Sequence, residues 1–407
     1  MALILTRSPY FVDKSNLNDD ASIKLEIGDY IDGSDFEISK TYSLLFRNAN
    51  LIDVSPLIRD YLSDRYRWVK TSTQGYYSGG DDEKLRYVRI TVSGSKDGVL
   101  QSDIVKEAYV SDGYLYSTDE YNKDFSTELK ERSYYAGSTD LIYKLDDSDI
   151  QIPLVNTSNS LISGNIPILY EKVTANYYKN NELVGTKNVI LDNEFSYYGY
   201  SYISSSGGGI FGGNRYTSFK SRVEFDNGIV EDNDCLDRFF EEFRVQDFDK
   251  IQLVSQSGAY KEIRVKTIEE CKYKPYKITF LNRFGVEEDL WFFKRSDKTI
   301  SINKEMFRGN SIGSYNAGKG VKTMQQFNVN GYEKITLNSG FVEEEMNEAF
   351  RQLLLSEEIT LYDYKENKEY NVNIATSELQ YKQHVNDKLI NYTIEFEFAH
   401  EVINNVG

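Results

Sequence analysis

The pattern of apolar and polar residues along the chain is mostly that of β-strands. In residues 22–27 every second residue is aliphatic, so one face of the predicted strand is apolar and the other is charged. Residues 38–46 are expected to form a second strand, and residues 87–92 a third with a clear period of two. Asp97 and Gly98 then predict a tight turn. These segments predict a sheet with one buried face in the N-terminal part of the chain.

Two segments have the spacing of amphipathic helices instead. In residues 55–62, Ser55 is the expected N-cap and Pro56 suits the first helical position. Residues 343–356 have a longer apolar stripe, with Ser339 as the predicted N-cap. Three glutamates lie in the first turn of this helix, where the helix dipole favours negative charge. Both helices are short, so strands should dominate the fold.

The rest of the chain predicts hairpins and isolated strands. Residues 172–178 and 183–191 flank a polar segment and predict a hairpin with a longer loop. A short amphipathic helix is expected over residues 234–243. Further strands are predicted at residues 216–225, 276–281, 290–293, 299–303, 358–364, 369–374 and 389–398.

The chain of 407 residues is long enough for about two to four domains. Changes in composition predict three of them. Residues 1–155 are expected to form a β-sandwich-like domain with long loops, including a polar surface excursion over residues 111–150. Residues 156–268 should form a middle β-rich domain with a Gly-rich arm at residues 204–215, and residues 269–407 an α+β domain. The predicted fold class is therefore mainly β with a few short helices, in a multi-domain chain.

The composition argues against several classes of partner. The chain has 47 Lys and Arg against 64 Asp and Glu, a formal net charge of −17. Binding along nucleic-acid phosphates needs a local basic stripe, which the sequence lacks, and anionic membranes are disfavoured for the same reason. The apolar run of residues 1–5 is too short for a signal peptide or a membrane span. We expect synthesis in a bacterial cytoplasm, no export by the ordinary signal route, no specific nucleic acid and no membrane.

Residues that could carry chemistry are sparse. Two cysteines and two histidines are too few for a disulfide framework, a four-thiolate zinc site or Ser-His-Asp catalysis: Cys235, Cys271, His384 and His400. Residues 207–212 match G-x-G-x-x-G, but they lack the strand and helix that a dinucleotide site requires. Adjacent carboxylates such as Glu287 and Glu288 point to opposite faces of a strand and predict a solvated charge run. We therefore expect no catalytic, cofactor-binding or metal-binding residues and no enzyme activity.

Aromatic residues are the strongest contact signal, because the chain has 33 tyrosines and 22 phenylalanines. Tyrosine supplies a large amphipathic surface and is enriched at protein interfaces. A tyrosine run precedes the Gly-rich arm, and the candidate interface residues are Tyr197, Tyr198, Tyr200, Tyr202, Ile210 and Phe211. Ordinary strand packing and a sugar-binding surface would produce the same pattern. Residues 72–83, 111–126 and 309–320 are expected to be further arms.

Several strings resemble virion proteins of tailed bacteriophages that infect Bacteroidetes, including the crAss-like phages. They lie at residues 7–11, 52–62, 270–285, 290–293, 335–341, 352–356 and 388–398. The resemblance covers both ends of the chain, roughly half of its length, and none of these strings is a catalytic motif. It implies a structural role in the neck or tail of a virion, as a ring, adaptor or hub subunit.

The resemblance also sets the expected location and partners. The chain is expected in the virion, as a homo-oligomeric ring around the portal–tail axis that contacts neighbouring portal, ring or tail proteins. Identical neighbours would bury their aromatic surfaces against one another. A carbohydrate-binding or receptor-binding module of the same virion is the alternative. A glycosidase-type hydrolase is a third hypothesis, for which the sequence gives no reason to choose any carboxylate pair.

Overall fold

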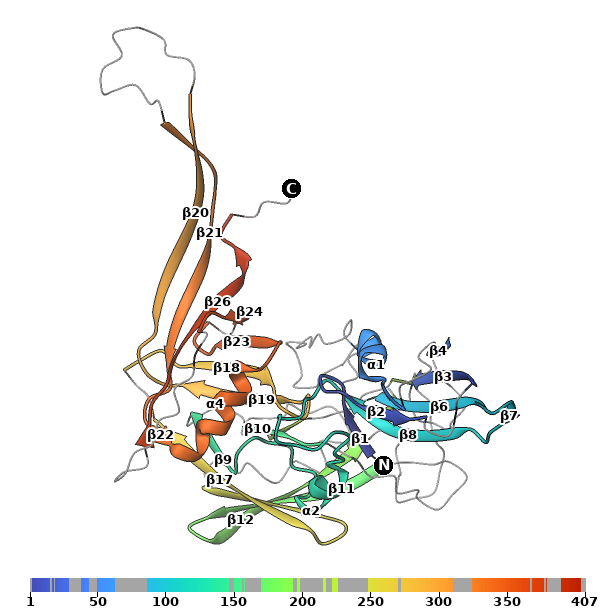
Figure 1. Ribbon diagram of the computed structural model, residues 1–407. Coiled ribbons are helices and arrows are strands. Elements are labelled where there is room, and N and C mark those ends of the chain that lie inside the picture. The colour runs from blue at the N-terminus through green and yellow to red at the C-terminus, as the bar shows by residue number, and fades with distance from the viewer. Residues whose placement is uncertain are drawn as a thin grey trace. The chain divides into compact units, whose positions relative to one another are not determined.

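The computed structural model describes most of the chain. The residues outside the description are 1, 15–16, 18, 29–37, 44–49, 63–85, 146–149, 156, 158–169, 193–195, 198–214, 217–221, 226–247, 270–271, 310–323, 367, 377, 379–388 and 404–407. The helix expected over residues 234–243 and both cysteines are among them. What is described is built mainly of strands with three short helices, which confirms the predicted fold class (Figure 1).

The chain divides into two compact units. Unit 1 comprises Met1–Ile268 together with Leu281–Glu288, and unit 2 comprises Glu269–Phe280 together with Asp289–Gly407. The prediction of three domains stays a prediction. However, β9 (Leu141–Leu145), from the predicted first domain, pairs in parallel with β17 (Tyr260–Ile268) of the predicted middle domain. One sheet therefore includes strands from both sides of the predicted boundary at residue 155.

The first sheet of unit 1 confirms the alternation predicted near the N-terminus. Its strand order is β1-β8-β6-β3-β4, with β7 paired to β6. Ile23, Leu25 and Ile27 of β3 are completely buried on one face, as their spacing requires. The strands are β1 (Ala2–Leu5), β3 (Asp19–Gly28), β4 (Ile38–Ser43), β6 (Arg86–Lys96), β7 (Val99–Leu100) and β8 (Ile104–Ser111).

Helix α1 (Ser55–Leu62) lies where the sequence predicts it, and Ile58 packs into the core of this sheet. Ser55 is not its N-cap, because Ser55 is already the first helical residue. Instead, the carboxylate of Asp53 accepts hydrogen bonds from the backbone N–H and the hydroxyl of Ser55, at 3.0 and 2.7 Å. Asp53 ends β5 (Leu51–Asp53), which pairs with β2 (Phe11–Asp13).

The second sheet of unit 1 has the order β12-β11-β16-β17-β9. Strands β11 (Tyr170–Lys179) and β12 (Glu182–Asp192) form the predicted hairpin, with β16 (Lys250–Ser255) beside β11. The prediction of a longer loop is wrong, because Asn180 and Asn181 alone connect the two strands, with φ of 50° and 66°. Two residues with positive φ are the signature of a type I′ turn, whose twist matches that of the flanking strands.

The segment that follows β8 is buried at both ends, which corrects in part the expectation of a surface excursion. Asp112, Gly113, Tyr114 and Phe125 are buried, so residues 111–126 are not a free arm, whereas residues 117–124 between them are exposed apart from Asp119. A Cβ on Gly113 would lie 2.5 Å from the carbonyl oxygen of Arg283, so this close approach requires glycine. Helix α2 (Ser126–Glu131) continues the segment and buries Leu129.

Small two-stranded pairs complete unit 1. Strand β10 (Ile150–Pro153) pairs with β15 (Arg222–Phe225), and β13 (Ser196–Tyr197) pairs with β14 (Arg215–Tyr216). Of the strand predicted over residues 216–225, only its two ends are described.

Unit 2 is built on one seven-stranded sheet with the order β19-β18-β23-β24-β26-β21-β20. Helix α4 (Asn347–Leu354) packs on it through Phe350, whose ring centre lies 6.1 Å from that of Phe292. Trp291 is buried. The strands are β18 (Tyr276–Leu281), β19 (Glu287–Phe292), β20 (Asp297–Arg308), β21 (Met324–Asn338), β23 (Ile359–Asp363), β24 (Lys368–Ile374) and β26 (Thr393–Glu401).

Two local predictions in unit 2 are wrong. Helix α4 begins at Asn347, after a single turn of 3-10 helix over Glu344–Met346, and Ser339 does not cap it. The hydroxyl of Ser339 donates to Gly340 and accepts the backbone N–H of Tyr392. The strand predicted over residues 389–398 is interrupted before β26, and its first part, β25 (Leu389–Ile390), pairs with β22 (Val342–Glu343).

Candidate functional site: a projecting hairpin

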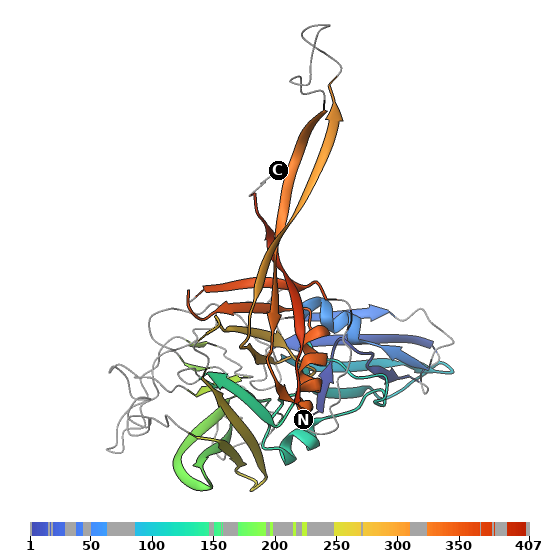
Figure 2. The same cartoon turned by 90° about the vertical axis from the view of Figure 1, so that its left-hand side faces the viewer.

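The most exposed structure of unit 2 is a long hairpin formed by β20 and β21. Strand β20 is the outermost strand at one edge of the sheet. Among the described residues it pairs only with β21. Strand β26 pairs with β21 only from Tyr332 onward, so the distal part of the hairpin is a two-stranded ribbon. Figures 1 and 2 both show this ribbon extending far beyond the other strands of unit 2. We call residues 297–308 and 324–331 the arm.

The arm exposes a large amount of apolar surface. All twelve residues of β20 are exposed, although strands with aliphatic residues normally bury one face. Apolar patches of this kind are uncommon on monomeric proteins unless another molecule covers them. The large apolar side chains of the arm, each between 37% and 59% exposed, are Ile300, Ile302, Met306, Phe307, Met324, Phe327 and Val329.

The two faces of the arm differ in chemistry. Successive side chains of a strand point to opposite faces, so the even-numbered residues of β20 share one face. That face, which we call the cationic–apolar face, has Lys298, Ile300, Ile302, Lys304, Met306 and Arg308. All three cations of β20 are therefore on one face. The opposite face has Thr299, Ser301, Asn303, Glu305 and Phe307.

Residues of β21 directly opposite this face add to it. Met324 is paired with Arg308, and Glu333 is paired with Ile300 nearer the base of the hairpin. The register shifts between Asn303 and Glu305 because β21 has one extra residue there. Asn328, at φ 48°, lies in this bulge of β21, so the alternation of β20 itself is unbroken.

The base of the hairpin is fastened to β26 by polar contacts. The Lys334 ammonium lies 3.2 Å from Glu395 and 3.5 Å from Glu397, and its hydrogen bond with Glu395 raises the pKa of Lys334. The hydroxyl of Tyr332 donates to Glu401, which raises the pKa of Tyr332. Exposed pairs of this kind add little stability each, and they supplement the backbone pairing of β21 with β26 at the base of the arm.

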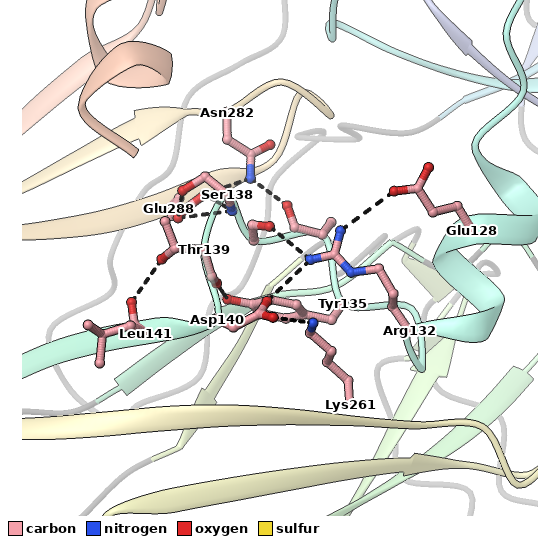
Figure 3. A network of polar contacts seen from close by, with 12 residues as sticks. Glu128, Arg132, Tyr135, Ser138, Thr139, Asp140, Leu141, Lys261, Asn282 and Glu288 are labelled. Carbon is pink, nitrogen blue, oxygen red and sulfur yellow. Dashed lines mark hydrogen bonds and ion pairs between the residues drawn. The ribbon is translucent and has the colours of Figure 1, made fainter. Parts of the chain in front are cut away.

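A buried polar network in unit 1 is the other concentration of polar side chains. The carboxylate of Glu288 accepts the hydroxyl of Ser138 at 2.5 Å, the backbone N–H of Ser138 at 3.0 Å and the side-chain amide of Asn282 at 2.9 Å (Figure 3). The same Asn282 amide donates to the carbonyl of Ala136 at 2.8 Å. The expectation that Glu288 belongs to a solvated charge run is wrong, because Glu288 is buried.

Next to these residues lies a chain of charged contacts. Asp140 forms an ion pair with Lys261 (Figure 3). Asp140 also lies 3.6 Å from the Arg132 guanidinium, and that guanidinium lies 3.9 Å from Glu128. The hydroxyl of Tyr135 donates to the carbonyl of Thr139 at 2.5 Å. Each of these groups is engaged by other protein groups. The network therefore serves to hold residues 132–141 and 281–288 together.

The structure leaves the predicted interface residues largely untested. Tyr197 lies in β13, where its backbone pairs with Arg215. The other five lie outside the described residues: Tyr198, Tyr200, Tyr202, Ile210 and Phe211. The predicted arm at residues 72–83 also lies outside them, as does all of the predicted arm at residues 309–320 except Gly309.

The sequence predicted an exposed loop at residues 309–320. It did not predict that the two strands on either side of that loop, β20 and β21, would also be exposed. The available signal was the two-residue repeat of Lys298, Ile300, Ile302, Lys304 and Met306. Cations within an aliphatic repeat are atypical of a buried strand face.

Comparisons with known proteins do not narrow the function: the sequence matches no protein-family model and no curated protein sequence. Among the described residues, no group of three or more His, Cys, Asp or Glu side chains could hold a metal ion. No helix in the described part of the chain is long and apolar enough to cross a membrane.

Proposed function

We propose that the chain is a structural, non-enzymatic component of a bacteriophage virion, as a ring or adaptor subunit of the neck or tail. The observation that carries this proposal is the arm, whose seven large apolar side chains are exposed on a two-stranded ribbon. Apolar surface of this extent favours a permanent partner, because leaving it in water promotes non-specific association. The resemblance of both ends of the chain to phage virion proteins suggests which kind of assembly supplies that partner.

The shape of the hairpin fits an assembly role better than recognition of a small ligand. Small-molecule sites are concave and surround their ligand, whereas the arm is a projection with two accessible faces and a free strand edge. Projections of this kind bind by lying against another protein surface or by adding a strand to another sheet. The proposed partners are further copies of this chain in a ring, together with neighbouring portal, ring or tail proteins.

The buried network around Glu288 supports a structural role in a different way. The carboxylate oxygens of Glu288 accept hydrogen bonds from Ser138 and Asn282, so this carboxylate holds two distant segments of the chain together. Such charge-assisted hydrogen bonds are roughly twice as strong as neutral ones, which suits a role in holding the fold together.

Quantitative mass spectrometry of purified virions tests the proposal. We expect peptides of this chain in the particles at several copies per virion, in a constant ratio to the portal protein. The measurement should include particles washed at high salt, because a ring subunit remains bound where a contaminant is removed. Absence of the chain from washed particles of the phage that encodes it would refute the proposed function.

A further inference from the structure

A second exposed surface lies at the other end of strand β21. Phe341 lies three residues beyond the end of this strand at Asn338 and is 70% exposed, more than any other large apolar side chain in the described part of unit 2. Leu389, 39% exposed, pairs across β22 and β25 with Glu343, which lies two residues after Phe341 in the chain. Glu344 and Glu345 follow Glu343 in the chain. We call these five residues the Phe341 patch, and it combines apolar surface with three carboxylates.

The arm and the Phe341 patch cannot meet within one molecule. Both are attached to β21, the arm at its Met324 end and the patch just beyond its Asn338 end. At about 3.3 Å per residue, these ends are roughly 46 Å apart along a continuous strand. Figure 1 shows the same separation, with the arm and β22 at opposite ends of the unit 2 sheet. Any contact between the two surfaces must therefore join different molecules.

The two surfaces are complementary in charge and similar in apolar character. The cationic–apolar face of the arm has Lys304 and Arg308 on either side of Met306, and the register adds Met324 beside Arg308. The patch has Phe341 and Leu389 next to three consecutive glutamates. Glu333 is on the same face of the hairpin but near its base, about 27 Å from Met324 by strand length. On a chain with a net charge of −17, a cationic apolar face has a natural partner in an acidic apolar one.

We propose that the distal arm of one copy of this chain docks on the Phe341 patch of a second copy. This inference rests on the proposed function and names the partner of the arm within it. Because donor and acceptor surfaces differ, the contact is head-to-tail: each copy uses its arm on one neighbour and its patch on the other. Such contacts close into a ring when the rotation between copies allows it, and otherwise extend as a filament.

Complementary charge reversals test the contact. One variant of the full chain has Lys304→Glu with Arg308→Glu, and the other has Glu344→Lys with Glu345→Lys. Each variant alone places like charges across the contact, and we expect its apparent dissociation constant to rise by at least about tenfold. An equimolar mixture pairs a reversed arm with a reversed patch and a native patch with a native arm. The mixture should therefore assemble as the unmodified chain does.

Sedimentation velocity over a range of protein concentrations, at low and high salt, is the measurement. Lys365→Glu with Lys368→Glu is the matched control for the arm variant, because it makes the same charge change at two exposed positions of unit 2 and should leave assembly unchanged. Circular dichroism verifies that every variant is folded. An unmodified chain that remains monomeric throughout, single variants that assemble normally, or a mixture that fails to recover would each overturn the proposal.

Disulfide trapping gives a second readout that does not depend on charge. Copies with Met306→Cys should cross-link to copies with Leu389→Cys, whereas neither variant should cross-link to itself beyond the level of the unmodified chain. Equal self-cross-linking of the Met306→Cys variant would indicate arm-to-arm pairing and contradict the head-to-tail contact.

The outcomes separate this inference from the proposed function. If the chain is present in washed virions but the charge reversals leave assembly unchanged, the arm has another partner and the virion role stands. If the mixture recovers assembly but virions lack the chain, the contact stands and the virion role fails.

Discussion

Glu288 accepts hydrogen bonds from both the hydroxyl and the backbone N–H of Ser138, a residue 150 positions earlier in the chain. Asn282 donates to the same carboxylate, at the other end of the turn between β18 and β19. The tip of this hairpin, Leu281–Glu288, belongs to unit 1, whereas most of its two strands belong to unit 2. A few buried hydrogen bonds thus hold the segment through which the chain passes from one unit to the other.

Replacing Glu288 should therefore destabilise unit 1. In a Glu288→Ala variant the Ser138 and Asn282 donors lose their acceptor inside the protein, and we expect a loss of about 1–3 kcal/mol in the free energy of unfolding. Urea denaturation with hydrogen exchange at residues 136–138 and 281–288 measures this effect. Glu131→Ala, an exposed change in α2, is the control and should stay within about 0.5 kcal/mol. Equal stability of the two variants would contradict the role of Glu288.

The ion pair between Asp119 and Arg283 predicts a pH dependence. Partial burial acts to raise the pKa of Asp119, but the hydrogen bond from the Tyr116 N–H and the charges of Arg283 and Lys123 outweigh it, so the pKa is lowered. A lowered pKa gives stability that is fully present above the unfolded-state value, near 3.8, and is lost as the pH falls through the folded-state value.

An Asp119→Asn variant should lose about 1–2 kcal/mol of unfolding free energy at pH 7. The difference from the unmodified chain should shrink below about pH 4, because Asp119 becomes protonated first in the unfolded state and then, at lower pH, in the folded state. Urea titrations at both pH values measure the difference, with Glu120→Gln as an exposed neighbouring control. A difference that is the same at pH 7 and pH 3 would show that charge is not the cause.

The turn between β11 and β12 predicts different effects on stability for two small substitutions. Asn181 has φ of 66°, a conformation that glycine adopts freely and alanine does not. We expect Asn181→Ala to cost about 1 kcal/mol and Asn181→Gly to be neutral within about 0.5 kcal/mol. Thermal unfolding of the two variants compares them directly, and a more stable alanine variant would rule out the positive-φ turn.

Local patterns predicted most of the strands but not how they associate. The strict alternation of Ile23, Leu25 and Ile27 requires one buried face, and the structure has that face. Alternation says nothing about which distant strand becomes the neighbour, so the parallel pairing of β9 with β17 was not predictable. Ser339 has the residue type of a helix cap, but a hydrogen bond from Tyr392, 53 positions away, gives it a different role.

For the same reason, local sequence patterns did not predict the roles of Glu288 and of the arm. Glu288 lies in a pair of adjacent glutamates, a pattern typical of solvent-exposed positions. Its buried, structural role depends on hydrogen bonds with Ser138 and Asn282, which the sequence does not reveal. Within the arm, only residues 299–303 were predicted, as an ordinary strand, and exposure was expected only for the loop at residues 309–320, because a sequence does not reveal that a strand leaves its sheet. What the sequence does contain is the unusual mixture of Lys304, Met306 and Arg308 on one strand face.

Shortening the arm should abolish assembly without unfolding the protein. Joining Ser301 to Tyr332, which are paired in register, through an Asn-Gly turn removes the distal ribbon and keeps the base of the hairpin. Every removed residue of β20 is exposed, so the unfolding temperature should change little, whereas self-association and incorporation into particles should be lost. Sedimentation velocity and particle composition measure both. Normal incorporation of the shortened chain into particles would show that the arm is not required for assembly.

A cryo-electron microscopy reconstruction of the neck and tail in intact virions would show whether the arm has a protein partner there. We predict several copies of this chain around the tail axis, with Ile302, Met306 and Phe307 of each arm covered by a neighbouring protein. A particle without the chain, or one in which these side chains face solvent, would contradict this prediction.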